Sequence, residues 1–282
     1  MKLIDTHSHI NFNQFKEDGG EVIQRALKKD VEMIIVGAEY KTSRRAIEYA
    51  NKYEKGVYSA VGLHPLHLQK ITAQEEEENI SFDTRGEEFH YDIYEKLAKS
   101  DEVVAIGEVG LDYYHINLAE NLNEIKKRQQ EVLVKQLLLA RELDLPVIIH
   151  CRMAHLDLLS LLKDFKKKYA RYLPNDRPWG VIHCFSGDED LAWRYFNLGL
   201  MISFTGLITF SKQWDDLIRK MPSDRFMIET DCPFMAPEPY RGKRNEPLLV
   251  KYVAQRIAEI RSTELEKIAD ISTKNAQAFF EI

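Results

Sequence analysis

Two histidines near the start of the chain, His7 and His9, have the type and spacing of a metal-binding pair. Side chains at positions i and i+2 of a β-strand point to the same face, so the two imidazoles can approach one ion. Taken alone, a His-x-His pair is more often an ordinary polar strand end than a metal site. The metal interpretation therefore depends on further ligands from elsewhere in the chain.

The elements that must bring such ligands together follow a βα pattern. Short β-rich apolar segments alternate with helical patterns, which is typical of a parallel sheet built from βα units. The clearest helical pattern covers residues 124–143. Eight strand segments favour an α/β fold of the (β/α)₈ TIM-barrel type. The predicted strands cover residues 2–6, 31–36, 57–61, 103–107, 147–149, 180–182, 200–204 and 226–229.

Reactive side chains follow most of these predicted strands. Glu108 follows the fourth strand, His150 the fifth, His183 the sixth and Asp231 the eighth. In a (β/α)₈ barrel the C-terminal ends of all strands converge on one mouth, where active sites are built. Six polar residues that merely cap separate strands are the less favoured alternative, because independent strand ends rarely all carry ligand types. The predicted metal ligands are His7, His9, Glu108, His150, His183 and Asp231.

Four imidazoles and two carboxylates exceed the needs of one tetrahedral ion with an open position, and they suit two ions that share a carboxylate. We assign Glu108 as this bridge, with His7, His9 and Asp231 completing the first site. His150 and His183 complete the second site. Two ions about 3.5 to 4 Å apart would share a water whose pKa falls toward 7. The ligand types admit Mg²⁺, Mn²⁺ or Zn²⁺ and do not choose among these divalent ions.

Contacts with a substrate are predicted from cations near the same mouth. The net charge of −6 offers no general basic surface, so binding of a polyanion must be local. Arg152 and His64 end strands at the mouth and are predicted to hold phosphate. For Arg152 this is favoured over a purely structural ion pair, whereas His64 is about equally suited to finishing a turn before proline. A basic segment is a further candidate, with a segment tied down by carboxylates as the alternative. This segment contributes Arg241, Lys243 and Arg244.

Other residues near the strand ends receive supporting roles. Asp112 is predicted to orient a loop, and Glu229 to orient a metal-binding histidine from behind. The three cysteines form no CxxC pair and each lies beside a predicted site residue. We expect them to be unpaired, small buried residues and neither disulfides nor metal ligands. They are Cys151, Cys184 and Cys232.

The organisation of the chain favours one domain over residues 1–282, because no Pro-rich or Gly/Ser-rich linker divides it. Residues 72–92 are acidic and long for a βα connection, which predicts an insertion at the rim or over the site. Residues 264–282 predict extra helical packing at the C-terminal end. No apolar run is long enough to cross a membrane and no signal peptide is recognised, so a cytoplasmic protein is expected.

Six phrases in a fixed order resemble the TatD family of metal-dependent deoxyribonucleases over nearly the whole chain. They are IDTHSHI, VGLHP, AIGEVGLDYY, VIIHCR, VIHCFSG and IETDCPFMAPEPYRGKRNEP. The resemblance implies a barrel, the two-metal ligand set, and hydrolysis of phosphodiester bonds in DNA. It further implies a 3′ to 5′ exonuclease on single-stranded ends, with DNA as partner and no obligate protein partner. DNA repair is one of several roles that this activity would fit.

The expected mechanism is attack of a metal-activated water on phosphorus. Asp231 would position this water and accept its proton, and Glu108 would hold both ions, so these two residues are the predicted catalytic pair. Two other classes of function use similar ligands. A small-molecule amidohydrolase, lactonase or phosphatase is one alternative, and a noncatalytic metal-dependent binding protein is the other.

Overall fold

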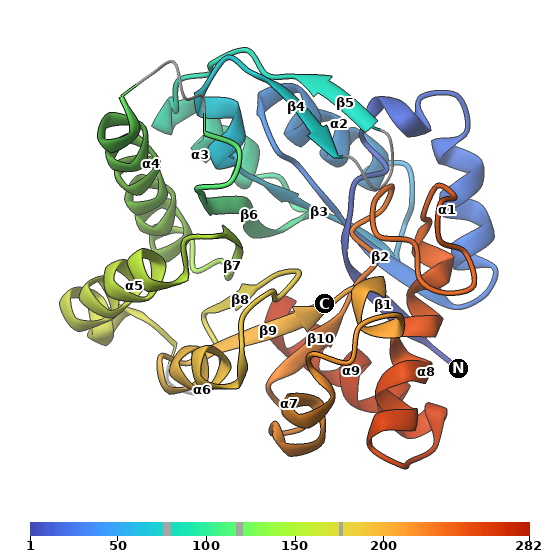
Figure 1. Cartoon of the computed structure of the whole chain (residues 1–282). Coiled ribbons are helices and arrows are strands. Elements are labelled where there is room, and N and C mark those ends of the chain that lie inside the picture. The colour runs from blue at the N-terminus through green and yellow to red at the C-terminus, as the bar shows by residue number, and fades with distance from the viewer. Residues whose placement is uncertain (76–79, 117–120, 175–176) are drawn as a thin grey trace.

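The predicted barrel is confirmed by the computed structural model, which describes residues 1–75, 80–116, 121–174 and 177–282. Within these residues, parallel strands follow one another around a barrel and the helices surround it (Figure 1). The strands, in their order around the barrel, are β1 (Leu3–Ser8), β2 (Val31–Val36), β3 (Val57–Val61), β6 (Val103–Asp112), β7 (Val147–Arg152), β8 (Gly180–Ile182), β9 (Leu200–Phe204) and β10 (Phe226–Ile228).

The helices cover the outside of the barrel and bury one apolar face each. In α4, the residues Val132, Leu133, Leu137 and Ala140 are buried, as their helical spacing predicts. The α-helices are α1 (Gly19–Leu27), α2 (Tyr40–Ala50), α3 (Tyr91–Ala98), α4 (Leu122–Glu142), α5 (His155–Tyr169), α6 (Glu189–Asn197), α7 (Asp215–Lys220), α8 (Val250–Ile260) and α9 (Leu265–Phe280). Short 3₁₀ helices are η1 (Asn13–Phe15), η2 (Pro65–Leu68), η3 (Ala170–Tyr172), η4 (Gly206–Thr209) and η5 (Pro247–Leu249).

The barrel interior at the end opposite the mouth is an apolar core, and the last helix, α9, covers it. Alternate residues of the strands, such as Ile4, Ile148 and Met227, point inward and form one buried cluster. Phe279 and Phe280 of α9 belong to the same cluster, and α9 contacts β1 and β10. Within the predicted C-terminal segment 264–282 the structure therefore has one helix, which plugs the end of the barrel opposite the mouth.

Backbone hydrogen bonds close the barrel at the mouth. The amide of Asp231 donates to the carbonyl of His7 at 2.9 Å, and the amide of His9 donates to the carbonyl of Cys232 at 2.8 Å. These bonds join the end of β1 to the segment that follows β10, so residues more than 220 positions apart become neighbours. The two ends of the sheet thereby bring the first and the last predicted ligands to the same place.

The predicted insertion, residues 72–92, contains a two-stranded antiparallel pair outside the barrel. It consists of β4 (Thr72–Glu75) and β5 (Ile80–Asp83), while residues 76–79 of the predicted segment lie outside the described residues. The base of the pair is held by the Thr84 hydroxyl, which donates to the Gln69 carbonyl at 2.6 Å. The helix α3 begins at Tyr91, so the last two residues of the predicted segment belong to a helix.

Three strands reach further toward the mouth than the sequence predicts. β1, β6 and β7 end at Ser8, Asp112 and Arg152, beyond the predicted ends at residues 6, 107 and 149. The polar side chains that suggested a strand end lie within the paired part of the strands, because β6 and β7 stay paired as far as Asp112 and Arg152. Several predicted ligands therefore sit on strands and not on loops.

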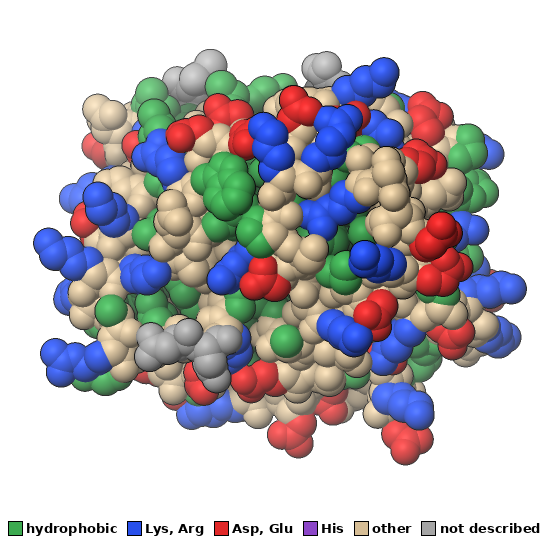
Figure 2. Space-filling model, turned by 90° about the horizontal axis from the view of Figure 1, so that it is seen from below, with side chains coloured by type: hydrophobic (Ala, Val, Ile, Leu, Met, Phe, Trp, Pro, Cys, Tyr) green, Lys and Arg blue, Asp and Glu red, His purple; other side chains and the backbone are tan. Residues whose placement is uncertain are grey.

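One face of the outer surface carries mixed charge. On the side that carries α6 and α7, acidic and basic side chains are interspersed (Figure 2). Within the described ranges, no helix is both long and apolar enough to span a bilayer.

Candidate metal centre

Simple strand alternation places two of the histidines. Ile148 and Val181 point into the barrel core, so the residues two positions later, His150 and His183, point inward at the mouth. The same alternation holds from Met227 in β10 onward to Glu229. In each of these strands the core residue and the mouth residue are two positions apart, so their side chains lie on the same inner face of the sheet.

In β1, the histidines face the mouth only because the strand is irregular. Ile4 points into the core, so regular alternation would turn His7 and His9 away from the mouth. Between Asp5 and Ser8, however, β1 advances three residues while β2 advances two. This bulge shifts the alternation by one residue and turns both histidines inward.

A second bulge places Glu108 in β6. Between Ile106 and Val109, β6 advances three residues while β7 advances two, and Glu108 lies in this stretch. Its amide donates to the carbonyl of Gly37 at 2.9 Å, which ties the bulge to β2. Two residues later a side chain is impossible, because a Cβ on Gly110 would lie 2.0 Å from the carbonyl oxygen of His150. Close backbone approach therefore keeps β6 beside the histidine of β7.

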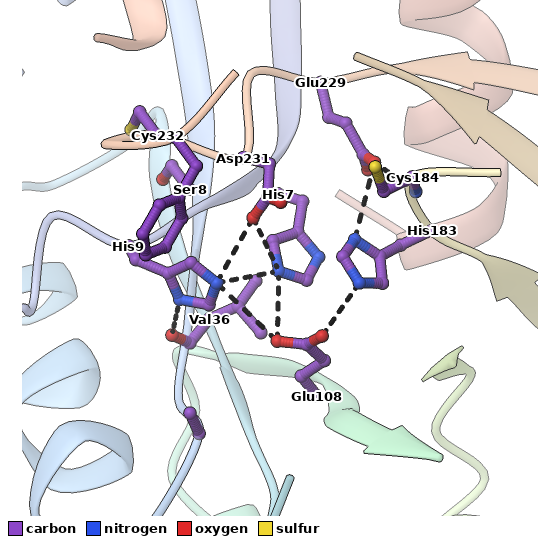
Figure 3. A network of polar contacts seen from close by, with 12 residues as sticks. His7, Ser8, His9, Val36, Glu108, His183, Cys184, Glu229, Asp231 and Cys232 are labelled. Atoms are coloured by element: carbon purple, nitrogen blue, oxygen red, sulfur yellow. Dashed lines mark hydrogen bonds and ion pairs between the residues drawn. The ribbon is translucent and has the colours of Figure 1, made fainter. Parts of the chain in front are cut away.

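Glu108 lies at the centre of the cluster, and its two oxygens face different groups (Figure 3). Oε1 lies 2.8 Å from Nε2 of His183 and 2.9 Å from Nδ1 of His150. Oε2 lies 3.5 Å from Nε2 of His7 and 3.6 Å from Nε2 of His9. Asp231 faces the second pair, with Oδ1 3.4 Å from His9 and 3.7 Å from His7. The structure thus brings all six predicted ligands together.

Hydrogen bonds hold the far nitrogens of His9 and His150 from behind, and a carboxylate lies behind the far nitrogen of His183, so the near nitrogens are turned toward the centre. Nδ1 of His9 lies 2.9 Å from the carbonyl of Val36, and Nε2 of His150 lies 3.1 Å from Asp112. Nδ1 of His183 lies 3.5 Å from Glu229, in agreement with the role predicted for that residue. Histidines that bind metals are typically oriented by such contacts. The donor set and its orientation fit divalent ions.

The electrostatics of the cluster favour ionised carboxylates. Burial would raise the pKa of Glu108, but the surrounding imidazoles, His64 and His183 foremost, hold that pKa well below its usual range. Burial likewise opposes protonation of His150, yet hydrogen bonds to Asp112 and Glu108 outweigh it and raise its pKa to about 9. Buried negative charge that attracts protons onto its neighbours is also suited to attract a metal cation.

Two aspartates contribute more than the sequence suggested. Asp112 orients a loop as predicted, since Oδ1 accepts from the amides of Tyr114 and His115 at 2.9 Å each. Its Oδ2 also holds His150, so one carboxylate connects this loop to the metal centre. Asp5 was not recognised, and it accepts from the Thr230 amide at 2.8 Å. The signal in the sequence was a carboxylate two residues before His7, within an apolar strand. In the structure this carboxylate holds the segment next to Asp231.

The cysteines are free, as predicted. Cys151 and Cys232 are buried, and burial raises the pKa of the Cys151 thiol to about 12, which makes it a poor nucleophile at neutral pH. Cys184 is only partly buried, and its amide donates to Glu229 at 2.6 Å. The carbonyl of Cys232 helps to close the barrel, as described above. Packing and backbone bonds therefore account for these residues.

An open cavity of about 990 Å³ lies over the metal centre, and two of the predicted substrate contacts line it. His64 places Nε2 3.3 Å from Oε1 of Glu108. Arg152 lies with its guanidinium carbon 4.1 Å from the ring centre of Tyr114, whose exposed fraction is 54%. Arg85 and Glu87, which follow the β4–β5 pair, also line the cavity. The segment predicted as an insertion therefore contributes to its wall.

The basic segment after Asp231 occupies a different position. Arg244 forms two hydrogen bonds with Asp18, at 2.9 and 2.5 Å, and lies over the ring of Phe15. The guanidinium of Arg241 lies 3.7 Å from the ring centre of Phe210. None of Arg241, Lys243 and Arg244 is among the described residues that line the cavity. For Arg244 this geometry favours the alternative of a segment tied down by carboxylates, and substrate contact by the three cations stays a prediction.

Comparison with known proteins places the chain in a family. The model of the TatD-related DNase family matches residues 4–281. The chain belongs to the TatD family. Relatives of this TatD-family chain include the uncharacterized metal-dependent hydrolase YabD of Bacillus subtilis (strain 168), which is 38% identical over 99% of each chain. The 3′-5′ ssDNA/RNA exonuclease TatD of Rahnella sp. (strain Y9602) is 32% identical, over 96% of this chain and 95% of that protein.

Solved structures agree with this assignment. The crystal structure of YJJV, a TatD homologue from Escherichia coli K12, superposes with a TM-score of 0.79 and 30% identity. The match covers 99% of this TatD-family chain and 98% of the other. The chain is therefore a TatD-family metal-dependent hydrolase with a TIM-type barrel.

Proposed function

We propose that this TatD-family hydrolase is a two-metal phosphodiesterase that removes nucleotides from the 3′ ends of single-stranded DNA. The observation that carries the proposal is the position of Glu108, whose two oxygens face two separate ligand groups. A carboxylate between two groups of imidazoles is the arrangement expected of a bridge between two ions. The activity in the name of the Rahnella relative, 3′-5′ ssDNA/RNA exonuclease, supports the choice of substrate.

In this proposal, Glu108 belongs to both ion sites. His7, His9 and Asp231 would hold the first ion, and His150 and His183 the second. Divalent ions bound there would neutralise phosphoryl oxygens and lower the pKa of water toward about 7. The two groups adjoin each other, since the ring of His183 stacks on that of His7 with ring centres 4.0 Å apart.

Asp231 is the residue proposed to orient the attacking water and accept its proton. Burial would raise its pKa, but the hydrogen bond with His9 and the nearby His7 and His183 outweigh burial and lower that pKa. An ionised carboxylate at neutral pH is the form that can accept a proton. Its amide bond to the carbonyl of His7 fixes its place at the mouth.

The cavity supports a substrate larger than a simple phosphate ester. Its volume of about 990 Å³ lies at the upper end of the range for small-molecule sites. Arg152 and the exposed ring of Tyr114 lie side by side in its wall. A cation beside an aromatic face is typical of proteins that bind single strands, where phosphates meet the cation and bases stack on the ring.

The test is degradation of single-stranded DNA labelled at its 5′ end by protein stripped of metal with EDTA. We expect stepwise shortening from the 3′ end on addition of Mg²⁺ or Mn²⁺, and none with the Glu108→Gln variant. A matched RNA strand measures the preference between the two polymers. Intact DNA with metal bound, together with hydrolysis of small esters, amides or lactones, would overturn the proposal in favour of a small-molecule hydrolase.

A further inference from the structure

Four buried histidines and the partly buried His150 surround Glu108, and the nitrogens that they turn toward it differ chemically. A neutral imidazole carries a proton on one nitrogen and a lone pair on the other, and only the lone pair can bind a metal. The tautomer is set by the hydrogen bond that the far nitrogen makes. The partners of the far nitrogens therefore separate metal ligands from hydrogen-bond donors.

For His9 and His150 the far nitrogen faces an oxygen that can only accept. These oxygens are the carbonyl of Val36 and a carboxylate oxygen of Asp112, at 2.9 and 3.1 Å. His183 has Glu229 in the same place, at 3.5 Å. The oxygen behind each of these rings can keep a proton on the far nitrogen, so the near nitrogen is free to give its lone pair to a cation that enters the centre.

His64 is the reverse case. Its far nitrogen, Nδ1, accepts a hydrogen bond from the backbone amide of Leu66 at 3.1 Å. A backbone amide can only donate, so Nδ1 carries the lone pair and Nε2 carries the proton. This Nε2 points at Oε1 of Glu108 from 3.3 Å. His64 therefore turns a proton toward the centre, whereas the acceptors behind His9 and His150 let those rings offer a lone pair there.

The orientation of the His64 ring is well determined by its surroundings. The residue caps η2, with Pro65 at the first helical position, and its own amide donates to the carbonyl of Ala38 at 2.9 Å. The ring packs edge to face on His150, with ring centres 4.3 Å apart. Turning the ring over would place carbon atoms against both Leu66 and Glu108 and lose both contacts. The side chain is 7% exposed, so water does not replace them easily.

We propose that His64 is not a metal ligand but a neutral hydrogen-bond donor that holds a phosphoryl oxygen of the bound substrate. The distances from His64 to Glu108 and His150 alone would allow His64 to be a third metal ligand beside them. The proton on Nε2 excludes metal binding through that nitrogen. Once metal ions occupy the oxygens of Glu108, the Nε2 proton needs another acceptor. An oxygen-rich group entering the cavity supplies one, and a preorganised donor there stabilises developing negative charge. The choice of phosphate as this group rests on the function proposed above.

The first measurement counts metal ions and their affinity, because it does not depend on any substrate. Titration of metal-free protein with Mn²⁺ by calorimetry should give the same number of sites for His64→Ala as for the natural chain, with affinities within about threefold. His150→Ala is the matched control and should lose one site or weaken it at least about tenfold. Loss of a site in His64→Ala would show that His64 is a ligand and overturn the proposal.

The second measurement uses inorganic phosphate as the probe on Mn²⁺-loaded protein. We expect His64→Ala to bind phosphate about tenfold more weakly, the size expected for one hydrogen bond to a charged group. His64→Gln places an amide donor near the former Nε2 and should recover part of the affinity, whereas His64→Asn reaches only the former Nδ1 and should not. Equal affinities in all variants would overturn the proposal. Normal phosphate binding without DNA cleavage would instead count against the proposed nuclease function alone.

Discussion

The two ends of this barrel are built from the same strands and have opposite chemistry. At the closed end, inward side chains such as Ile148 and Met227 form an apolar cluster covered by Phe279 of α9. At the mouth, the next inward residues on those strands are His150 and Glu229, which take part in a buried polar network. One strand thus stabilises the fold at one end and positions reactive groups at the other, as is general in such barrels.

The difference also appears in backbone regularity. The strands β7 and β8 deliver their histidines by plain alternation from the core to the mouth. The strands β1 and β6 carry a bulge at their ligands, between Asp5 and Ser8 and between Ile106 and Val109. The closed end tolerates regular geometry because it needs only apolar volume, whereas the mouth needs particular atoms at particular places. Changes at the two ends should therefore separate activity from stability.

The largest effect on activity is expected at Asp231. The variant Asp231→Asn keeps the shape of the side chain but removes the charge that accepts a proton, so turnover should fall about a thousandfold or more. Turnover is measured together with bound metal and with the thermal midpoint. Near-normal turnover at full metal occupancy would contradict the role given to this carboxylate.

The closed end should show the opposite pattern. Phe279→Ala removes a side chain that is 1% exposed and leaves a cavity in the core, so the free energy of unfolding should drop by about 3 to 5 kcal/mol. Turnover per folded molecule should stay within about twofold. Denaturant unfolding measures the first quantity. Lys274→Ala on the same helix is the control, because its ion pair with Asp270 is exposed and worth less than about 1 kcal/mol.

A smaller effect on activity is expected at Asp112, which holds His150 through the nitrogen that faces away from Glu108. Asp112→Asn can still accept from the amides of Tyr114 and His115, but its amide group cannot accept from Nε2 of His150. Metal affinity at the site that contains His150 should fall about 10- to 100-fold, and the thermal midpoint of the metal-free protein should also fall, because the hydrogen bond between Asp112 and His150 is lost. Unchanged affinity would mean that the orientation of His150 does not depend on this bond.

The smallest effect is expected from Arg244, which lies away from the cavity. Arg244→Ala removes the ion pair with Asp18, and because both side chains are about one-third exposed the loss should be about 1 kcal/mol or less. The hydrogen bond from Arg244 lowers the pKa of Asp18, so its contribution is present above the unfolded value near 3.9. It disappears as the pH falls through the lower folded value. The stability difference between variant and natural chain should therefore shrink in acid.

Turnover of the Arg244→Ala variant on DNA decides between the two interpretations of the basic segment. A change below about twofold supports a structural ion pair. A rise in KM of tenfold or more would instead support the substrate contact predicted from the sequence.

The grouping of the six candidate ligands was largely predictable because each of them follows an apolar segment of strand length. His150 and His183 needed only the alternation of a strand and the convergence of strand ends in a barrel. The bulges at His7 and Glu108 were not predictable, since a bulge depends on the register between two strands and not on one segment. The tautomer of His64 was equally hidden, because the amide of Leu66 that sets it acts through three-dimensional geometry.

Residues outside the centre were harder to assign for a related reason. Asp5 was read as part of an ordinary strand, although it braces Thr230 at the far end of the chain. Arg244 was read by its charge, whereas its partner Asp18 is distant in sequence and carries no distinctive motif. Long-range pairs of common polar residues leave no periodic signal, so the ion pair of Arg244 with Asp18 could not be found from the sequence.

The measurement that tests the account most directly is the number of metal ions bound per chain in the natural protein and in Glu108→Gln. Metal-free protein is dialysed against Mn²⁺ and the bound ions are counted by mass spectrometry, with circular dichroism as the control for folding. The account predicts two ions in the natural protein and one or none in the folded variant, because both sites share this carboxylate. One ion in the natural protein, or two in the variant, would contradict the bridging role of Glu108.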